Sequence, residues 1–126
     1  MKKISNPEKL CDMVNELFDL ENALEEHVYI IVVDTKNKIR GVSELSHGGS
    51  NSSIIDIKSI FTRVLLMGGI GFFLIHNHPS GDTTPSREDL EITQKIKNAS
   101  RLMDINFIDH LIVGNESRSM KAHGEL

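Results

Sequence analysis

The sequence has few of the residues that cross-link small proteins or bind metals through sulfur. It contains one cysteine, Cys11, no tryptophan, and only 5% aromatic residues in a chain of 126. A lone cysteine cannot form an intrachain disulfide or supply the several thiolates of a cysteine-rich zinc site. A chain of this length can bury a core without such cross-links, so we expect a single domain.

Long apolar runs are also missing. The sequence contains no stretch of about 18 apolar residues, which is the length needed to cross a bilayer. The opening residues, MKKISNPEKL, lack the apolar region of a secretory signal. Together with the lone cysteine, this predicts a cytoplasmic protein. The formal net charge of -4 argues against a basic nucleic-acid-binding surface over the whole chain, although a local basic patch stays open.

The spacing of apolar residues predicts helices and strands in the order αββαβαβ. Helical spacing runs from the Asn6-Pro7 entry as far as Leu24, and again over residues 54–66 and about 87–103. Strand patterns cover residues 27–33, 39–45, 70–75 and 105–113, with a loop at 46–53 and a short edge strand at 117–121. This order predicts an α/β fold, a single domain whose mixed β-sheet is flanked by helices.

Polar chemistry is concentrated in residues 75–90, IHNHPSGDTTPSREDL, directly after the short apolar strand expected at 70–75. His76 and His78 are two residues apart, so on an extended backbone both imidazoles lie on one side and can share a ligand. A polar strand end that faces solvent explains the same pair. The two histidines alone leave both interpretations open.

Asp89 adds a carboxylate one turn inside the helix expected at 87–103. The loop that contains Pro79, Gly81 and Pro85 can fold this turn back over the strand end. Two imidazoles and a carboxylate suit zinc and leave a fourth position for water, as in catalytic zinc sites. The alternative is a helix-capping box, in which Ser86 and Asp89 hydrogen-bond to each other's backbone.

A metal-activated water needs a proton acceptor, and Glu26 is the best candidate. It immediately precedes the first expected strand, from which its carboxylate can point into the site. Glu25 has equal standing on this reasoning, and either residue can instead be a solvated charge at a helix end. Ser86 can donate a hydrogen bond to the oxyanion of a tetrahedral intermediate.

The stretch HNHPSGDTTPSRED resembles the signature of the RadC family, a bacterial branch of the JAMM/MPN+ (Mov34/JAB) metallopeptidase-like domains. The matching pattern is His-x-His, Pro-Ser-Gly, then Pro-Ser-x-x-Asp. The stretches EEHVYIIVVDTKNKI and DHLIVG resemble the family's opening glutamate, first strand and turn, and its last strand. The resemblance therefore covers nearly the whole chain, and it implies the JAB/MPN (cytidine deaminase-like) architecture.

The resemblance also implies the roles of individual residues. It places one zinc ion, with a water as the fourth ligand, on His76, His78 and Asp89. It selects the second of the two neighbouring glutamates, Glu26, as the general acid/base, and it assigns Ser86 to the oxyanion. Related JAMM domains cut peptide or isopeptide bonds, notably those that join ubiquitin-like proteins to lysines. The prediction is a zinc metallopeptidase with a protein or peptide substrate.

Full-length RadC-like proteins contain a segment that resembles a helix-hairpin-helix DNA-binding unit, joined to this domain. The chain begins one helix before its first strand, so we expect residues 1–126 to form the RadC-like JAMM/MPN+ domain without that segment. The alternative function is a non-catalytic module linked to DNA repair or mobile-element biology. A zinc deaminase is excluded because its Pro-Cys-x-x-Cys ligands cannot be built with one cysteine. The tripeptide His-Asn-His is a coincidental match to the name of the HNH nucleases.

The remaining polar residues have simpler expectations. We expect His110, on the last long strand, to lie close behind the site, and Asn77 to brace the loop through side-chain hydrogen bonds. Cys11 should be buried or partly buried on the first helix, without a role. The histidines expected to face solvent are His27, His47 and His123.

Overall fold

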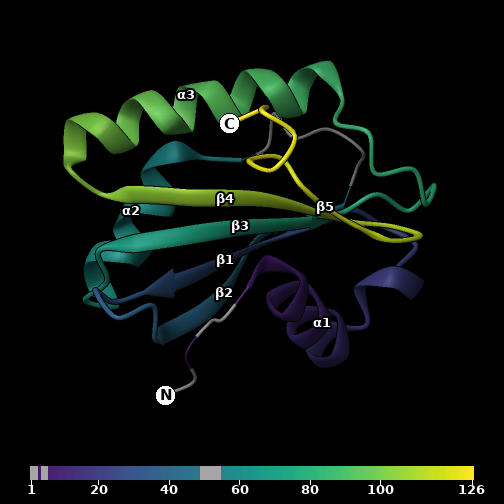
Figure 1. The fold of residues 1–126 in the computed structure, drawn as a ribbon, viewed down its shortest axis with the longest axis horizontal. Coiled ribbons are helices and arrows are strands. Elements are labelled where there is room, and N and C mark those ends of the chain that lie inside the picture. Colours follow the sequence, from purple (N-terminus) through teal and green to yellow (C-terminus); the bar gives the residue numbers. More distant parts are fainter. Residues whose placement is uncertain (1–2, 4–5, 49–54) are drawn as a thin grey trace.

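The computed structural model describes residues 3, 6–48 and 55–126. It contains three α-helices, one short 3-10 helix and five strands in this part of the chain (Figure 1). In chain order they are α1 (Pro7–Phe18), η1 (Leu20–Asn22), β1 (His27–Val33), β2 (Ile39–His47), α2 (Ile57–Leu66), β3 (Gly71–Asn77), α3 (Arg87–Met103), β4 (Asn106–Val113) and β5 (Ser117–Ser119).

The strands form one mixed sheet in the order β2-β1-β3-β4-β5. All neighbouring strands are antiparallel except β3 and β4, which are parallel and connected through α3. A parallel pair needs a long crossover connection, and α3 supplies it: the helix follows β3 in the chain, packs on one face of the sheet, and leads into β4. The predicted α/β fold with a mixed sheet flanked by helices is confirmed.

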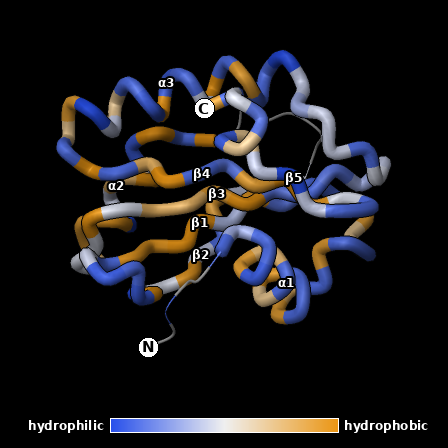
Figure 2. Tube along the Cα trace, viewed as in Figure 1, coloured by the Kyte–Doolittle hydropathy of each residue, from blue (hydrophilic) through white to orange (hydrophobic). Residues whose placement is uncertain are grey.

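Helices cover both faces of the sheet and create two apolar cores. On one face, α2 and α3 pack on side chains of β1 and β3, with Ile60 and Ile96 at the centre of the contact. On the other face, α1 packs through Leu10 and Val14. Figure 2 shows hydrophobic residues along the central strands and mixed polarity along α3. Because both faces are covered, all seven residues of β3 are buried, as predicted for a central strand.

The register between β1 and β3 determines what lies at the end of the sheet near the site. Their antiparallel ladder ends with Val28 opposite His76. If the same register continues, Glu26 falls opposite His78, two residues further along each strand. Side chains alternate between faces, so Glu26 shares the face of Val28, on which α2 and α3 pack.

Several expected boundaries are wrong. Leu24 does not belong to the first helix: α1 ends before Asp19, which adopts a left-handed conformation with φ 52°. The short helix η1 then buries Leu20, while Leu24 is 96% exposed. Strand β2 continues to His47 through residues expected to form a loop. Residues 49–53 of that predicted loop, and the predicted helix start at Ile54, lie outside the described residues.

The other predicted elements are confirmed within one to three residues, and the range of α3 matches its prediction. Among the described residues, no helix is both long and apolar enough to span a membrane.

Candidate metal centre

The two histidines of the His-x-His pair lie at the carboxyl end of β3. His76 belongs to the strand, and His78 follows its last residue. The alternation of the strand places both rings on the same face, and their Nε2 atoms are 2.9 Å apart. The expectation that the pair can share one ligand therefore agrees with the observed geometry.

Asp89 reaches the histidines from the first turn of α3. Its Oδ2 lies 3.1 Å from Nε2 of His78 and 3.5 Å from Nε2 of His76. The same oxygen accepts a hydrogen bond from the backbone N–H of Ser86 at 2.9 Å. The Ser86 Oγ in turn accepts the backbone N–H of Asp89 at 3.0 Å, which completes a capping box. The metal interpretation and the capping interpretation of Asp89 are thus compatible in one structure.

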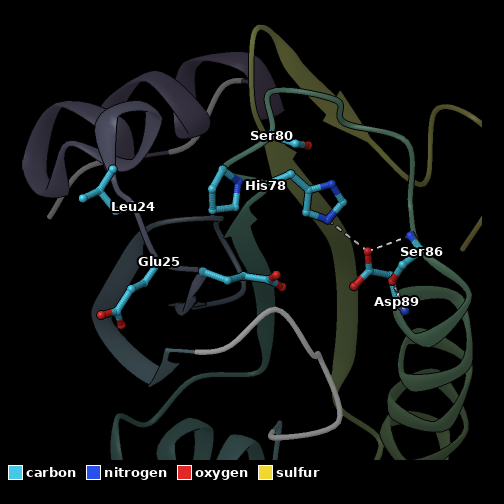
Figure 3. Close-up of a pocket in the computed structure, with 8 residues that line it drawn as sticks. Leu24, Glu25, His78, Ser80, Ser86 and Asp89 are labelled. Carbon is cyan, nitrogen blue, oxygen red and sulfur yellow. Dashed lines mark hydrogen bonds and ion pairs between the residues drawn. The ribbon is translucent and has the colours of Figure 1, made fainter.

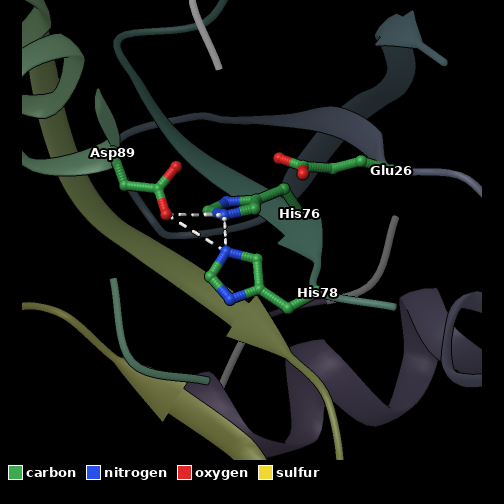
Figure 4. A group of neighbouring side chains, drawn as sticks. All are labelled: Glu26, His76, His78 and Asp89. Atoms are coloured by element: carbon green, nitrogen blue, oxygen red, sulfur yellow. Dashed lines mark hydrogen bonds and ion pairs between the residues drawn. The ribbon is translucent and has the colours of Figure 1, made fainter. Parts of the chain in front are cut away.

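The spacing of these three atoms suits a tetrahedral zinc ion. Zinc bonds of about 2.0 to 2.1 Å place two ligands of a tetrahedron about 3.3 Å apart. The distances among Nε2 of His76, Nε2 of His78 and Oδ2 of Asp89 are 2.9, 3.1 and 3.5 Å, on either side of that value (Figure 4). The three side chains converge on one point, as the dashed triangle in Figure 4 shows.

The hydrogen bonds behind the rings leave their Nε2 atoms available to a cation. His78 Nδ1 lies 2.8 Å from the carbonyl oxygen of Asp82, which only accepts, so Nδ1 carries the proton. His76 Nδ1 lies 2.7 Å from Nε2 of His110, and His110 Nδ1 lies 2.7 Å from Oγ1 of Thr93. With neutral rings, one proton arrangement that satisfies these contacts has each ring donating from Nδ1 to the next group. The Nε2 atoms of His76 and His78 then present lone pairs that a metal ion can bind, whereas protonated rings donate from Nε2 to Asp89.

The pKa shifts of these groups favour a negative charge on Asp89 with positive charge beside it. Burial alone would raise the pKa of Asp89, but hydrogen bonds to His76 and His78 hold the pKa of its carboxyl well below its usual range. The hydrogen bond to Asp89 raises the pKa of His78, against the opposing effect of burial. Burial lowers the pKa of His110 well below the ordinary histidine value. Asp89 is therefore an anion, and His110 is a neutral ring behind the site.

Glu26 approaches this cluster from the other side. It lies immediately before β1, is 9% exposed, and points toward the histidines in Figure 4. One carboxylate oxygen of Glu26 lies within 4.8 Å of the ligand atoms of His76, His78 and Asp89. Burial raises the pKa of Glu26, and the nearby Asp89 charge acts in the same direction. The group is therefore close enough to exchange a proton with a water held between it and the triad.

The cluster opens into a pocket of about 580 Å³. One wall is formed by the segment before β1, and the other by the loop after β3 and the start of α3. Ser86 lines the pocket on the α3 side, beside Asp89 (Figure 3). Glu25 also lines the pocket, but Figure 3 shows its carboxylate directed away from His78 and Asp89. The structure thus distinguishes the two glutamates: the Glu26 carboxylate points toward the histidines, and the Glu25 carboxylate points away.

Four of the five residues predicted for the site line this pocket: Glu26, His78, Ser86 and Asp89. The fifth, His76, is buried and belongs to the cluster of ligand atoms that lie within 4.8 Å of one another. His110 lies behind it, as expected, and Cys11 is buried. His47 is exposed, but the expectation for His27 is wrong: it is half-buried, with Nδ1 3.2 Å from Glu44. Sequence reasoning missed Thr93, because a single threonine on a helix carries no signal of a partner on a distant strand.

Within the described residues, this is the group whose histidine and carboxylate atoms could hold a metal ion. The fold and the cluster together define a single mixed-sheet domain with a candidate metal centre at the end of its central strands.

The particular family follows from comparison with known sequences. Residues 4–125 match the model of the RadC-like JAB domain, and the chain belongs to that family. The chain is also similar to proteins named UPF0758 from clostridia. It is 37% identical to one from Clostridium botulinum over 125 residues, which is 98% of this chain and 54% of that protein. It is 39% identical to one from Clostridium perfringens over 113 residues, which is 90% of this chain and 49% of that protein. The chain thus spans about half the length of the curated relatives it matches.

Proposed function

We propose that the domain is a zinc-dependent hydrolase of peptide or isopeptide bonds. One observation carries the proposal: two imidazole Nε2 atoms and a carboxylate oxygen converge at zinc-ligand spacing, and the carboxylate of a buried glutamate lies within 4.8 Å of them. Three protein ligands with an open fourth position are typical of catalytic zinc, whereas structural sites are closed by four protein ligands.

A zinc ion held by His76, His78 and Asp89 would supply Lewis-acid polarisation of the carbonyl and would acidify water. The carboxylate of Glu26 accepts a proton from the attacking water as its oxygen bonds to the carbonyl carbon. The same carboxyl group then delivers that proton to the amine nitrogen as the carbon–nitrogen bond breaks. Burial, which raises the pKa of Glu26, makes it a better proton acceptor than an exposed glutamate would be.

Ser86 contributes through its hydroxyl proton. Its Oγ already accepts the backbone N–H of Asp89, which orients the oxygen and leaves the O–H free to donate. The hydroxyl lines the same pocket as His78 and Glu26, so a carbonyl oxygen bound there lies within its reach. This donor stabilises negative charge that develops on the carbonyl oxygen.

Protein or peptide is the proposed substrate class because the pocket lies open at the end of the sheet. Its walls mix an exposed apolar side chain, Leu24, and a proline, Pro79, with the acidic residue Glu25. An open cleft with apolar and polar walls accommodates an extended chain.

The test compares two neighbouring glutamates on a panel of fluorogenic peptides and lysine isopeptides. With zinc-loaded protein, Glu26→Gln should lower kcat by about 10²- to 10⁴-fold, because it removes the proton carrier. Glu25→Gln is the matched control and should keep full turnover, because the Glu25 carboxylate points away from the histidines. Full turnover by Glu26→Gln, or wild-type turnover that survives complete removal of zinc, would contradict the proposal.

A further inference from the structure

Asn77 lies between the two histidines in the sequence, yet its side chain hydrogen-bonds to the backbone at the start of β1. Its Oδ1 accepts the backbone N–H of His27 at 2.6 Å, and its Nδ2 donates to the carbonyl oxygen of Glu25 at 3.0 Å. The residue is 1% exposed. The main-chain ladder between β1 and β3 ends at Val28 and His76, so the Asn77 amide continues the pairing where the backbones have ceased to pair.

The two groups that Asn77 holds are the peptide groups on either side of Glu26. On an extended backbone, the C=O of one residue and the N–H two residues later point to the same edge. The opposite edge is also held, because the carbonyl oxygen of Glu26 accepts the backbone N–H of Gly48 at 3.0 Å. The backbone of Glu26 is thereby hydrogen-bonded on both edges, toward β3 by a side chain and toward the end of β2 by the main chain.

A backbone held on both edges directs its side chain perpendicular to the sheet. For Glu26 this is the face of His76, toward the three converging ligand atoms. Within the described part of the chain, no group is found to donate a hydrogen bond to the Glu26 carboxylate. Its direction therefore depends on its backbone and on packing, and the Asn77 amide fixes one edge of that backbone.

We propose that Asn77 is the positioning residue of Glu26, an inference that rests on the proposed function, in which Glu26 carries the proton. An asparagine suits the task because one planar group presents an acceptor and a donor side by side, as a peptide does. Aspartate has the same shape but no donor for the Glu25 carbonyl. Alanine leaves both the His27 N–H and the Glu25 carbonyl without a partner, so the segment before β1 must move to find water.

The experiment uses zinc-loaded wild type, Asn77→Ala and Asn77→Asp, with Asn98→Ala as the control, since Asn98 makes an exposed contact with Gln94 on α3. Asn77→Ala should keep one zinc per chain and lower kcat by about 100-fold, because a displacement of about 1 Å at a reacting group has that effect. Its KM should stay within about threefold of wild type, and the His27 amide should exchange with solvent faster. Asn77→Asp keeps the acceptor, so its His27 amide should remain protected while kcat falls.

Unchanged kcat together with unchanged protection of the His27 amide in Asn77→Ala overturns the inference. If wild type shows no zinc-dependent turnover, the proposed function fails, and crystal structures then decide the positioning role. A displaced Glu26 carboxylate in Asn77→Ala or Asn77→Asp supports the role of Asn77, and a carboxylate that stays in place in both overturns it. Should Asn77→Ala fail to fold, the isosteric Asn77→Asp tests the inference through kcat and the position of the Glu26 carboxylate, and no change in either overturns it.

Discussion

The Oδ2 atom of Asp89 has two kinds of neighbour, and both depend on the helix it belongs to. It accepts the backbone N–H of Ser86, which orients the carboxylate, and it faces the Nε2 atoms of the histidines. A carboxylate oxygen has two lone-pair directions, so one oxygen can cap a helix and bind a metal. The capping box is therefore the device that aims the ligand.

At the scale of single residues, the sequence predicted which side chains come together, but it did not predict the residues that support them. The spacing of His76, His78 and Asp89 is local, so a strand, a loop and a helix turn suffice to bring them together. The choice between Glu25 and Glu26 depends on which face of β1 each occupies and on the register with β3, which the residues alone did not provide. Asn77 was expected to brace its own loop, and it braces the segment before β1 instead.

His110 should control metal affinity without touching the metal. Its Nε2 lies 2.7 Å from Nδ1 of His76, and this contact fixes which nitrogen of the His76 ring faces the site. His110→Leu should raise the zinc dissociation constant by about 10- to 100-fold, as loss of outer hydrogen-bond partners does. A chelator competition titration on the folded variant measures it. His123→Leu, at an exposed position, is the control, and an unchanged constant for His110→Leu would argue against the orienting role.

At the scale of elements, the connection from β3 to α3 determines where His78 lies relative to Asp89. The backbone N–H of Gly81 donates to the carbonyl of His78, and the carbonyl of Gly81 accepts the N–H of Asn115 from the turn after β4. This loop is thus attached to two strands while it carries His78 toward Asp89. Proline and glycine in the sequence indicated a turn here, but the attachment to Asn115 pairs residues far apart in the chain and has no local pattern.

Gly81 and Gly124 make a matched pair for testing this loop. Both have positive φ, 90° and 70°, but a Cβ on Gly81 would lie 2.5 Å from Oδ1 of Asn115, whereas nothing lies within 4 Å of one on Gly124. Gly81→Ala should lower the free energy of unfolding by about 2 to 3 kcal/mol and weaken zinc binding, because the positive φ becomes strained and either the loop or the Asn115 side chain packed on it must shift. Gly124→Ala should cost about 1 kcal/mol and leave zinc binding unchanged.

Denaturant unfolding and a zinc titration of both variants measure these effects. Equal losses of stability and equal zinc affinity in Gly81→Ala and Gly124→Ala would contradict the account of the loop.

Ser86 should affect stability and turnover through separate parts of its side chain. Ser86→Ala removes a helix cap, which costs about 1 kcal/mol, and it also removes the proposed hydroxyl donor. Asn6→Ala is the control, because Asn6 caps α1 through the N–H of Lys9 at 2.8 Å, on the opposite face of the sheet. Both variants should lose similar stability in denaturant unfolding, while only Ser86→Ala should lose kcat. Equal kcat in the two variants would remove Ser86 from the oxyanion.

At the scale of the whole molecule, the order of elements was predictable and their arrangement was not. Apolar periodicity is a local property, so it located the helices and strands to within a few residues. The sheet order β2-β1-β3-β4-β5 and the parallel pairing of β3 with β4 arise from contacts between distant segments. The two helical layers bury β3 on both faces, and this central strand carries His76 to the end of the sheet where the site lies.

The most direct test is the zinc content of three purified proteins after zinc loading and dialysis, measured by plasma mass spectrometry. Wild type and Glu26→Gln should each retain one zinc per chain, because the proposed ligands are His76, His78 and Asp89. His78→Ala should retain none, since two ligands hold zinc far more weakly than three. A wild-type chain without zinc, or a His78→Ala variant that retains as much zinc as wild type, would contradict the metal centre.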